Sequence, residues 1–445
     1  MNKWQETEIG RIPVDWRLKI IDEIKSSKKH AIAMGPFGSN IKKENFREFG
    51  VPVIRGNNLN EFVFDEKNFV FLSEQKANSL KSSLCFKNDI VFTHRGTIGQ
   101  VGFITENSKF NKYVISQSGM KLSCNEEIVN SKFIFLFFKT KIGQHLLLRN
   151  TSQTGVPSIS KPTTSLKEIF VPVPPKNEAD EIVDVIFTIQ NKIDNLRKQN
   201  ETLEQIAQTL FKQWFVEFEF PNEEGKPYKS SGGKMVESEL GEIPEGWKVG
   251  KLGDLLELII DYRGKTPKKL KMDWSTIGIP ALSAKNIKNG KIVREDSMNH
   301  GSEELFNIWM KDELRKDDIL LTSEAPLGEL YYLADNKKYI LSQRLYALRA
   351  KNNYTSPYIY YWLNSYAGKY FLNRRATGST VVGIRQSELR KVEILIPEND
   401  ILKKSQNILK EIIYKKHKNY KAIKTLSQIR DTLLPKLMSG EIRVK

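Results

Sequence analysis

The sequence predicts an α+β protein that consists of two tandem copies of one globular domain, each followed by a long α-helix, with the two helices paired as an antiparallel coiled coil. Three observations predict this architecture. An internal repeat runs through most of the 445 residues, short β-like runs recur within each half of it, and a heptad pattern of apolar residues follows the first half. A fixed order of matched positions at a long period indicates that one architectural unit is present twice.

The repeat begins at an Ile-Pro-x-x-Trp segment, Ile12–Trp16, which returns as Ile243–Trp247. The residues between the matched positions differ, so we expect the two copies to share a scaffold and to present different surfaces. That combination is typical of a protein that recognises two unlike targets. The further matched pairs, in chain order, are Val51–Ile54 with Ile279–Leu282, Asp89 with Asp318, Thr93 with Thr322, Ser116 with Ser342, Gln117 with Gln343, Gly155 with Gly378 and Pro174 with Pro397.

Each globular copy is predicted to combine short strands with one aromatic amphipathic helix. Glycine and asparagine interrupt the β-like runs, which favours several short strands over a few long ones. Helices are predicted over Phe133–Leu148 and Tyr358–Leu372, and each copy ends in a strand that a proline stops. The predicted strands include Val51–Ile54, Ile90–Thr93 and Val114–Gln117 in the first copy, and Ile279–Leu282, Ile319–Thr322 and Ile340–Gln343 in the second.

A heptad seam predicts that the segment after the first copy is a long coiled-coil helix. Steps of four and three lead from Ile182 to Trp214, with one polar interruption at Asn200. A helix from Glu178 to Phe218 would span roughly 60 Å at about 1.5 Å per residue. The segment after the second copy repeats the pattern less strictly, and Pro435 should kink or end it. The residues expected to pair the helices are Ile186, Ile189, Ile193, Leu196, Leu203 and Leu210 in the first and Leu409, Ile412, Ile423, Leu426 and Leu433 in the second.

Opposite charges favour pairing of the two helices with each other. Residues 177–220 contain four basic and nine acidic side chains, whereas residues 401–445 contain twelve basic and three acidic ones. Antiparallel pairing would hold the globular copies at opposite ends of a spacer; the alternative is that each helix packs only on its own domain. The predicted domains are 1–175 and 235–397, with helices in 176–220 and 398–445 and a linker, rich in charge, serine and glycine, in 221–234.

The charge of the chain indicates a polyanionic partner. The formal net charge is +17, and each lysine or arginine that neutralises a phosphate releases condensed counterions, so nucleic acid is the leading candidate. A basic surface that binds nothing is the alternative. Two cysteines, Cys85 and Cys124, form neither a disulfide framework nor a CxxC pair, and we see no signal peptide or membrane-length apolar run. A cytoplasmic protein is therefore expected.

Polar side chains that follow the short strands are the candidates for contact with DNA, because a rigid scaffold can aim them and because Arg, Asn, Gln and Glu match base edges in the major groove. Each copy also has an early basic loop centred on glycine, at 35–43 and 262–269, although a plain turn with solvated lysines explains these loops equally well. Late glycine loops, Gln153–Gly155 and Arg375–Ser379, offer donors for phosphate. The predicted DNA-binding residues are Lys42, Lys43, Arg55, Asn57, Asn58, His94, Arg95, Gln117, Arg263, Lys265, Lys268, Lys285, Asn286, Ser323, Glu324, Gln343, Arg344, Thr377 and Ser379.

No catalytic residue and no metal ligand is predicted. The five histidines are scattered and lack the HExxH spacing of a zinc site. No GxSxG turn, no GxGxxG segment before a helix and no Asn-Pro-Pro-aromatic tetrad for a flipped adenine is present. Nuclease carboxylates have looser spacing, so the sequence excludes a nuclease less firmly than the other classes.

The order of these motifs resembles the specificity subunit of a type I restriction-modification system. The likeness covers essentially the entire chain. It depends on the two Ile-Pro-x-x-Trp segments, on Tyr262–Pro267 near the start of the second copy, and on the helical stretch Gln208–Phe215 with its counterpart Asp431–Leu437.

The resemblance implies that each globular copy is a target recognition domain for one half of a split, asymmetric DNA site, and that the helices fix the separation of the two. It also implies a subunit without chemistry or cofactor of its own. Two modification subunits would use S-adenosylmethionine to methylate adenine, and two restriction subunits would use ATP and Mg to translocate and cleave DNA. The alternatives are a self-sufficient fused restriction-modification enzyme, which needs a cofactor pocket, and a non-catalytic coiled-coil scaffold.

Overall fold

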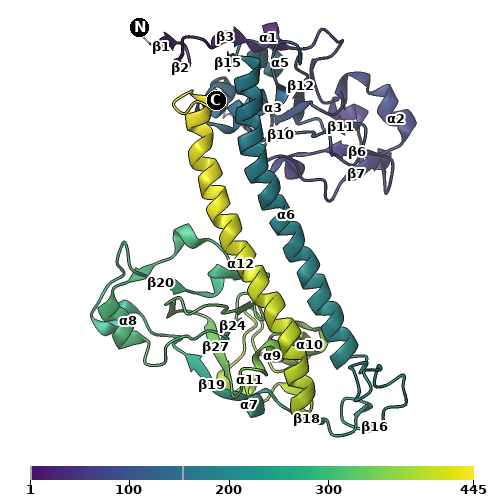
Figure 1. Cartoon of the computed structure of the whole chain (residues 1–445), viewed down its shortest axis with the longest axis vertical. Helices are drawn as coiled ribbons and strands as arrows, with labels where there is room; N and C mark the ends of the chain where they lie inside the picture. The colour runs from purple at the N-terminus through teal and green to yellow at the C-terminus, as the bar shows by residue number, and fades with distance from the viewer. Residues whose placement is uncertain (1–2, 153–154, 445) are drawn as a thin grey trace. The chain divides into compact units, whose positions relative to one another are not determined.

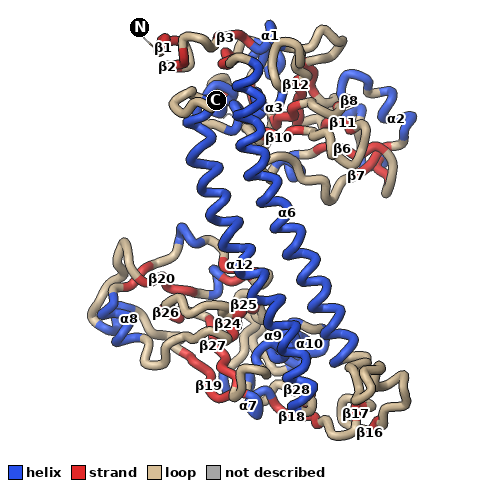
Figure 2. The backbone as a smooth tube through the Cα atoms, in the orientation of Figure 1, coloured by secondary structure: helices blue, strands red, loops and turns tan. Residues whose placement is uncertain are grey.

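The computed structural model describes residues 3–152 and 155–444 and groups the chain into two compact units. The first unit runs to Asn195 and resumes at Ala422, and the second comprises Leu196–Lys421. Figures 1 and 2 show the course of the chain and the mixture of helices and strands. Each unit contains one globular copy and part of each of two long helices, so the predicted α+β class is confirmed.

Strands of the first copy form two main sheets. The strands are β1 (Trp4–Thr7), β2 (Gly10–Pro13), β3 (Arg17–Ile20), β4 (Ile32–Met34), β5 (Phe46–Arg47), β6 (Val51–Ile54), β7 (Val70–Leu72), β8 (Leu84–Cys85), β9 (Ile90–Thr93), β10 (Val101–Phe103), β11 (Tyr113–Ile115), β12 (Gly119–Leu122), β13 (Thr151–Ser152), β14 (Ser158–Ile159) and β15 (Phe170–Val173). One sheet has the order β10-β9-β12-β4, and the other has the order β5-β7-β6-β11-β8. Strands β6 and β11 are parallel, with Val53 opposite Val114.

The second copy repeats this plan. Its strands are β16 (Met235–Val236), β17 (Ile243–Pro244), β18 (Lys248–Lys251), β19 (Leu256–Asp261), β20 (Ile279–Leu282), β21 (Ile287–Lys288), β22 (Lys291–Ile292), β23 (His300–Gly301), β24 (Ile319–Thr322), β25 (Leu330–Tyr332), β26 (Ile340–Leu341), β27 (Leu345–Ala350) and β28 (Glu393–Ile396). One sheet has the order β19-β27-β24-β25 and another the order β23-β20-β26. Strands β20 and β26 are parallel, with Ala281 opposite Ile340, as β6 and β11 are in the first copy.

Helices cover these sheets and continue into the long pair. They are α1 (Ile21–Ile24), α2 (Glu74–Ser79), α3 (Ser131–Lys139), α4 (Lys141–Leu148), α5 (Pro162–Lys167), α6 (Lys176–Phe215), α7 (Leu252–Leu255), α8 (Glu303–Trp309), α9 (Ser356–Asn364), α10 (Tyr366–Arg374), α11 (Gln386–Leu389) and α12 (Asn399–Met438). Among the described residues, no helix is both long and apolar enough to cross a bilayer.

The aromatic helix predicted in each copy is in fact two helices. In the first copy the Thr140 hydroxyl accepts from Gly143 N–H and so caps the start of α4. A Cβ on Gly143 would lie 2.2 Å from the Phe137 carbonyl oxygen, so only glycine permits this close turn. Ser365 and Gly368 make the same break between α9 and α10 in the second copy. Prediction from hydrophobic period missed the break because the apolar face continues through it.

Matched polar residues hold matched places inside the two copies. The Thr93 hydroxyl donates to the Thr97 carbonyl and accepts from Gln100 N–H, and Thr322 makes the same pair of bonds to Pro326 and Glu329. The repeat in the sequence is therefore a repeat of structure. These residues close the same loop in both copies, which explains their identity.

Buried carboxylates occupy the other matched position. Asp318 accepts two hydrogen bonds from the Arg349 guanidinium, at 2.9 and 2.8 Å. At the equivalent Asp89 the partner is Lys121, 3.5 Å away, and burial raises the pKa of the Asp89 carboxyl because the lysine and a serine offset only part of the desolvation. Both carboxylates accept from a backbone N–H three residues earlier, so they also shape the turn before the strand.

The long helices pair antiparallel in each unit. In the first unit the Arg430 guanidinium donates to the Gln190 side chain. In the second, Asn419 Nδ2 donates to Asn200 Oδ1 at 2.9 Å, and Lys416 forms an ion pair with Glu204. Partner numbers fall along α12 as they rise along α6, which fixes the direction. The predicted pairing of α6 with α12, teal and yellow in Figure 1, is confirmed.

The seam is more polar than the sequence pattern suggested. All eleven residues predicted to pair the helices are buried or half-buried. The apparent irregularity of α12 arises because three of its seam positions are polar and each faces a polar partner on α6, namely Arg430, Asn419 and Lys416. Ile408 and Ile429 match the apolar pattern in the sequence, but each is 42% exposed and lies outside the seam. Pro435 does not end the helix, which continues to Met438.

The helices also complete the globular cores. Ile182, Ile186, Leu434 and Leu437 belong to the core that contains Trp16. Ala207, Phe211, Leu402 and Leu409 belong to the core that contains Trp247. Each helix therefore contacts its partner and contributes to both cores, so the alternative that each helix packs only on its own domain is wrong.

An unusual lysine lies beside the helix pair in the first unit. Lys139 Nζ donates to the Val101 carbonyl at 2.6 Å and lies 5.6 Å from the centre of the Phe62 ring. The Arg430 guanidinium carbon lies 4.0 Å from the centre of the same ring. Burial, with a smaller contribution from the charge of Arg430, lowers the pKa of Lys139 to about 8.

We predict that the first unit becomes more stable as pH rises from about 8 to about 10.5. In that window the unfolded chain still binds the Lys139 proton and the folded chain has released it, so unfolding takes up a proton and stability increases with pH. Lys139→Met should remove this increase, and Lys141→Met, at an exposed neighbour, should retain it. Hydrogen exchange of the β10 and α3 amides at several pH values measures the effect. An identical pH dependence in wild type and Lys139→Met would contradict the assignment.

Candidate nucleic-acid interface

The parallel strand pair of the first copy brings two polar loops together. Strands β6 and β11 end at the same edge of their sheet, and Ser116 N–H donates to the Ile54 carbonyl at 2.9 Å. Arg55 and Asn57 directly follow β6, and Gln117 follows β11. Residues that are distant in the sequence therefore share one edge, as expected at the carboxyl ends of parallel strands.

A third loop, from Thr93 to Gln100, joins this edge. His94 N–H donates to the Ser118 carbonyl at 2.9 Å, which ties the loop to the turn after β11. Ile159 N–H donates to the His94 carbonyl, also at 2.9 Å, so the late loop of the copy lies against it as well. Arg95 is consequently held next to the Gln117 turn.

These loops enclose an open groove of about 700 Å³. Three predicted DNA-binding residues line it: Asn57, Arg95 and Gln117. Its other polar residues were not predicted from the sequence. Thr97 and Gln100 fall within seven positions of a predicted strand end, so a wider window after each strand would have included them. The lining residues are Gly56, Asn57, Asn60, Thr93, Arg95, Gly96, Thr97, Gln100, Gln117, Ser118 and Val156.

The second copy has the same framework around different side chains. Ser342 N–H donates to the Leu282 carbonyl at 2.8 Å, and Ser323 N–H donates to the Arg344 carbonyl at 2.9 Å. Ile384 N–H donates to the Ser323 carbonyl at 3.0 Å, which brings the late loop to the same place. The bonds match those of Ser116, His94 and Ile159 one by one.

Equivalent positions differ in charge between the copies. The hydrogen-bond pattern aligns Arg95 with Glu324 and Ser118 with Arg344. In the same alignment Gln100 corresponds to Glu329, since each backbone N–H donates to the matched threonine hydroxyl. One scaffold thus presents an arginine and amides in the first copy and an arginine with two carboxylates in the second.

Buried polar atoms without a protein partner gather at these edges. Five such side-chain atoms occur among the described residues, and four of them belong to Arg55, His94, Gln100 and Ser323. His94 and Ser323 occupy equivalent positions. An unsatisfied buried polar atom costs about 1–3 kcal/mol, so this clustering indicates a surface that acquires its partners from solvent or from a ligand. Burial lowers the pKa of His94, which favours the neutral ring.

Two predicted DNA-binding asparagines instead stabilise the scaffold. Asn58 is fully buried; its Oδ1 accepts from Arg55 N–H, and its Nδ2 donates to the Asp65 and Lys67 carbonyls. Asn286 repeats this arrangement with Ser283 and Val293. Their side chains are buried and their hydrogen-bonding atoms are used within the loop, so we assign them to holding the loops rather than to contact with DNA.

The early glycine loops also have a structural explanation. A Cβ on Gly35 would lie 1.8 Å from the Ser116 carbonyl oxygen, so glycine is required for packing against that turn rather than for approach to a phosphate. In the second copy Arg263 donates to both Asp261 oxygens and stacks on Tyr346, 4.1 Å from the ring centre. Lys265 donates to the Trp309 carbonyl at 2.8 Å. Arg263 and Lys265 are therefore engaged by the protein.

The remaining predicted residues lie on the surface. Lys42 and Lys43 follow the first glycine loop, and Lys268 follows the second. Of the late loops, Gln153 and Thr154 lie outside the described residues, and Thr377 is held by two backbone hydrogen bonds to Gly383. The exposed members of the predicted set are Lys42, Lys43, Asn57, Arg95, Gln117, Lys268, Lys285, Gln343, Arg344, Thr377 and Ser379. Their contact with DNA stays a prediction.

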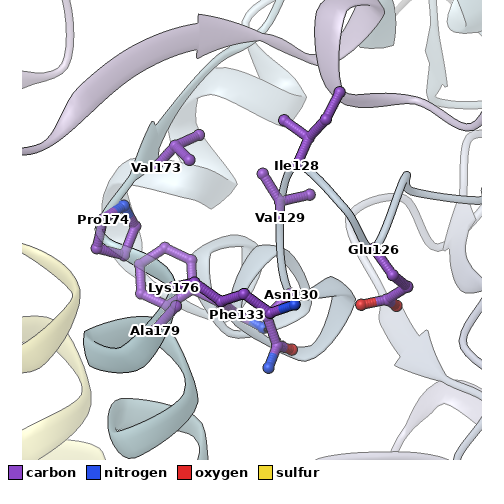
Figure 3. A pocket seen from close by; sticks show the side chains of 9 residues that line it. All are labelled: Glu126, Ile128, Val129, Asn130, Phe133, Val173, Pro174, Lys176 and Ala179. Atoms are coloured by element: carbon purple, nitrogen blue, oxygen red, sulfur yellow. Dashed lines mark hydrogen bonds between the residues drawn. The ribbon is translucent and has the colours of Figure 1, made fainter.

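A second hollow of the first unit is too small for a ligand. Figure 3 shows it between the loop at Ile128 and Val129 and the start of α6, where Lys176 and Ala179 lie. Its volume of about 10 Å³ holds one water at most. Among the described residues, no group of three His, Cys, Asp or Glu side chains is arranged to hold a metal ion.

Comparison with known proteins gives consistent matches along the chain. The type I restriction modification DNA specificity domain matches twice, at residues 15–205 and 244–428. The MjaIX specificity subunit of Methanocaldococcus jannaschii is 28% identical over an alignment that covers all of this chain and 97% of that protein. The HindI specificity subunit of Haemophilus influenzae is 25% identical, with 80% of this chain and 87% of that protein covered.

A solved structure shows the same fold. The crystal structure of an S subunit of a type I restriction-modification system from M. genitalium superposes with a TM-score of 0.63 at 18% identity, covering 95% of this chain and 96% of that one. The two domain matches together span most of the sequence, and each covers most of one globular copy and most of the long helix that follows it. The chain therefore belongs to the family of type I restriction-modification DNA specificity domains and contains two of them.

Proposed function

We propose that the chain is the DNA-sequence specificity subunit of a type I restriction-modification complex and that each copy recognises one half of a bipartite, asymmetric site. Family membership implies a recognition role without catalysis. The observation that supports two different half-sites is the groove framework, which is equivalent in the two copies and bears Arg95 in one where Glu324 stands in the other. Two copies that recognised the same sequence would be expected to bear the same side chain at this position.

Charge and side-chain type support DNA as the ligand. The net charge of +17 favours binding to the phosphate backbone of nucleic acid. Exposed lysines such as Lys42 and Lys268 are suited to the backbone, which positions a protein without reading sequence. Amides and arginines at the groove, such as Gln117 and Arg95, can pair with base edges. Phosphate contacts and base contacts therefore have separate residues in this proposal.

The paired helices act as the spacer in this proposal. Polar layers such as Asn200 with Asn419 cost stability but fix the register of two helices. A fixed register gives a fixed length between the globular copies, and half-site spacing in two-part DNA readers follows protein geometry. Recognition domains at 1–175 and 235–397 with helical spacers after each are consistent with this role.

The chemistry of the complex would belong to its partners. We infer that two modification subunits and two restriction subunits assemble with this chain in the cytoplasm. The modification subunits would bind S-adenosylmethionine, and the restriction subunits would bind ATP and Mg. Apolar residues on the outer helix faces, namely Val185, Ile206, Ile408 and Ile429, are at least 36% exposed and are suited to docking the modification subunits. This chain would bind and position DNA, and it would not itself form or break any covalent bond.

Methylation mapping tests the function. In cells that express this chain with its cognate modification subunits, we expect methylated adenines in a bipartite, asymmetric motif with a non-specific gap of roughly half to one DNA turn. A continuous palindrome would contradict the proposal. Binding of labelled S-adenosylmethionine by the isolated chain would favour a self-sufficient enzyme, and failure to bind DNA at low salt with or without the partners would favour a scaffold.

A matched deletion tests the spacer. Removing Lys192–Lys198 from α6 and Ala422–Gln428 from α12 takes one heptad from each helix and leaves the polar layers at Gln190 and Asn200 facing their partners. The spacer shortens by about 10 Å, so the gap in the methylated motif should shorten by about three base pairs at 3.4 Å each.

The control for this deletion removes the α6 heptad alone. It places Asn200 and Glu204 opposite the wrong residues of α12, so recognition should be lost while both globular copies stay folded by circular dichroism and limited proteolysis. An unchanged gap after the matched deletion would refute the spacer.

A further inference from the structure

The turn after β26 holds an arginine in a conformation that side chains rarely adopt. Arg344 has a φ of +61°, in the left-handed region, and its side chain is 53% exposed. The hydrogen bond from Ser323 N–H to the Arg344 carbonyl fixes the turn. Non-glycine residues in this region carry strain and cluster at ligand sites. The scaffold therefore presents Arg344, despite a conformational cost, at the position equivalent to Ser118 of the first-copy groove.

Glu324 orients the Arg344 side chain. Arg344 Nε lies 2.9 Å from Glu324 Oε1. Glu324 is itself held in place, because its backbone pairs with Gly383 and a Cβ on Gly383 would lie 3.1 Å from the Glu324 Cβ. A guanidinium has five donors in a planar fork, and one carboxylate accepts on one side of it. Donors therefore remain for a second acceptor.

The carboxylate decides which acceptor fits. A phosphate beside Glu324 would meet a like charge, whereas the O6 and N7 acceptors of guanine are uncharged and match an arginine fork. We propose that Arg344, oriented by Glu324, reads a guanine through the major groove of the second half-site. This inference rests on the proposed function and specifies the base that the second copy recognises.

The first copy supplies the contrast. Its residue at the Arg344 position is Ser118, and its residue at the Glu324 position is Arg95. The arginine of the first copy thus comes from the other loop, without a carboxylate at the equivalent position. Changes to Arg344 and Glu324 should accordingly affect only the second half-site.

The test uses the chain assembled with its modification subunits and duplexes in which every base pair of both half-sites is varied in turn. Arg344→Lys keeps the charge and loses the fork, so discrimination at one G·C pair of the second half-site should fall roughly ten- to hundredfold, with the first half-site unchanged. Glu324→Gln should weaken the same discrimination and raise affinity for all sequences. Lys268→Ala, at an exposed lysine, should weaken all duplexes alike.

Two results would overturn the inference. Equal weakening of all sequences by Arg344→Lys and Arg344→Ala would make Arg344 a phosphate contact, and retained guanine preference in both variants would remove it from base reading. The folded state of the second copy in each variant is checked by unchanged preference at the other base pairs of the second half-site. Absence of sequence preference in the wild-type complex would instead contradict the proposed function, so the two failures are distinguishable.

Discussion

The antiparallel contact between α6 and α12 is the constraint on which the rest of the structure depends. Each globular core contains residues from the beginning of one long helix and the end of the other, for example Ile186 with Leu437 in one and Phe211 with Leu409 in the other. Neither core is complete with one helix. The polar pairs of Arg430, Asn419 and Lys416 lie between these core residues along α12, and they fix the register of the two helices.

Duplication separates the residues that build the scaffold from those that vary on it. Thr93 and Thr322 close the same loop, and Asn58 and Asn286 hold equivalent turns together, so both pairs of residues belong to the scaffold. The groove edge between them bears different charges in the two copies while its backbone hydrogen bonds are kept. Such a framework allows recognition to change without a change of fold, which is the property that a specificity subunit requires.

Much of the fold could be predicted from the sequence because strong periodic signals carry it. The apolar seam of α6 is regular, and its single polar residue, Asn200, does face a polar partner. The seam of α12 could not be read in the same way, since Asn419 and Lys416 look like breaks until their partners are known. Helix breaks at Thr140 and Ser365 were missed because side-chain caps and glycine packing leave no mark on hydrophobic period.

The groove was harder to predict than the fold. Residues after strands were a sound guide to Asn57, Arg95 and Gln117, which do converge. The same rule selected Asn58 and Asn286, because sequence position does not reveal whether an amide side chain turns inward to its own loop or outward to solvent. The sequence likewise does not reveal that the Arg263 side chain donates to Asp261 in the folded structure. A side chain is available to a ligand only where no hydrogen bond or ion pair within the protein already engages it, and residue type alone does not reveal this.

We propose that the paired helices hold the two globular copies at one fixed separation. Spin labels at Gln75→Cys on α2 and Asn307→Cys on α8 report that separation by pulsed dipolar spectroscopy, and the native Cys85 and Cys124 are buried and should remain unlabelled. A single narrow distance distribution is predicted, the same with and without DNA. A broad distribution, or several separate distances, would contradict the account.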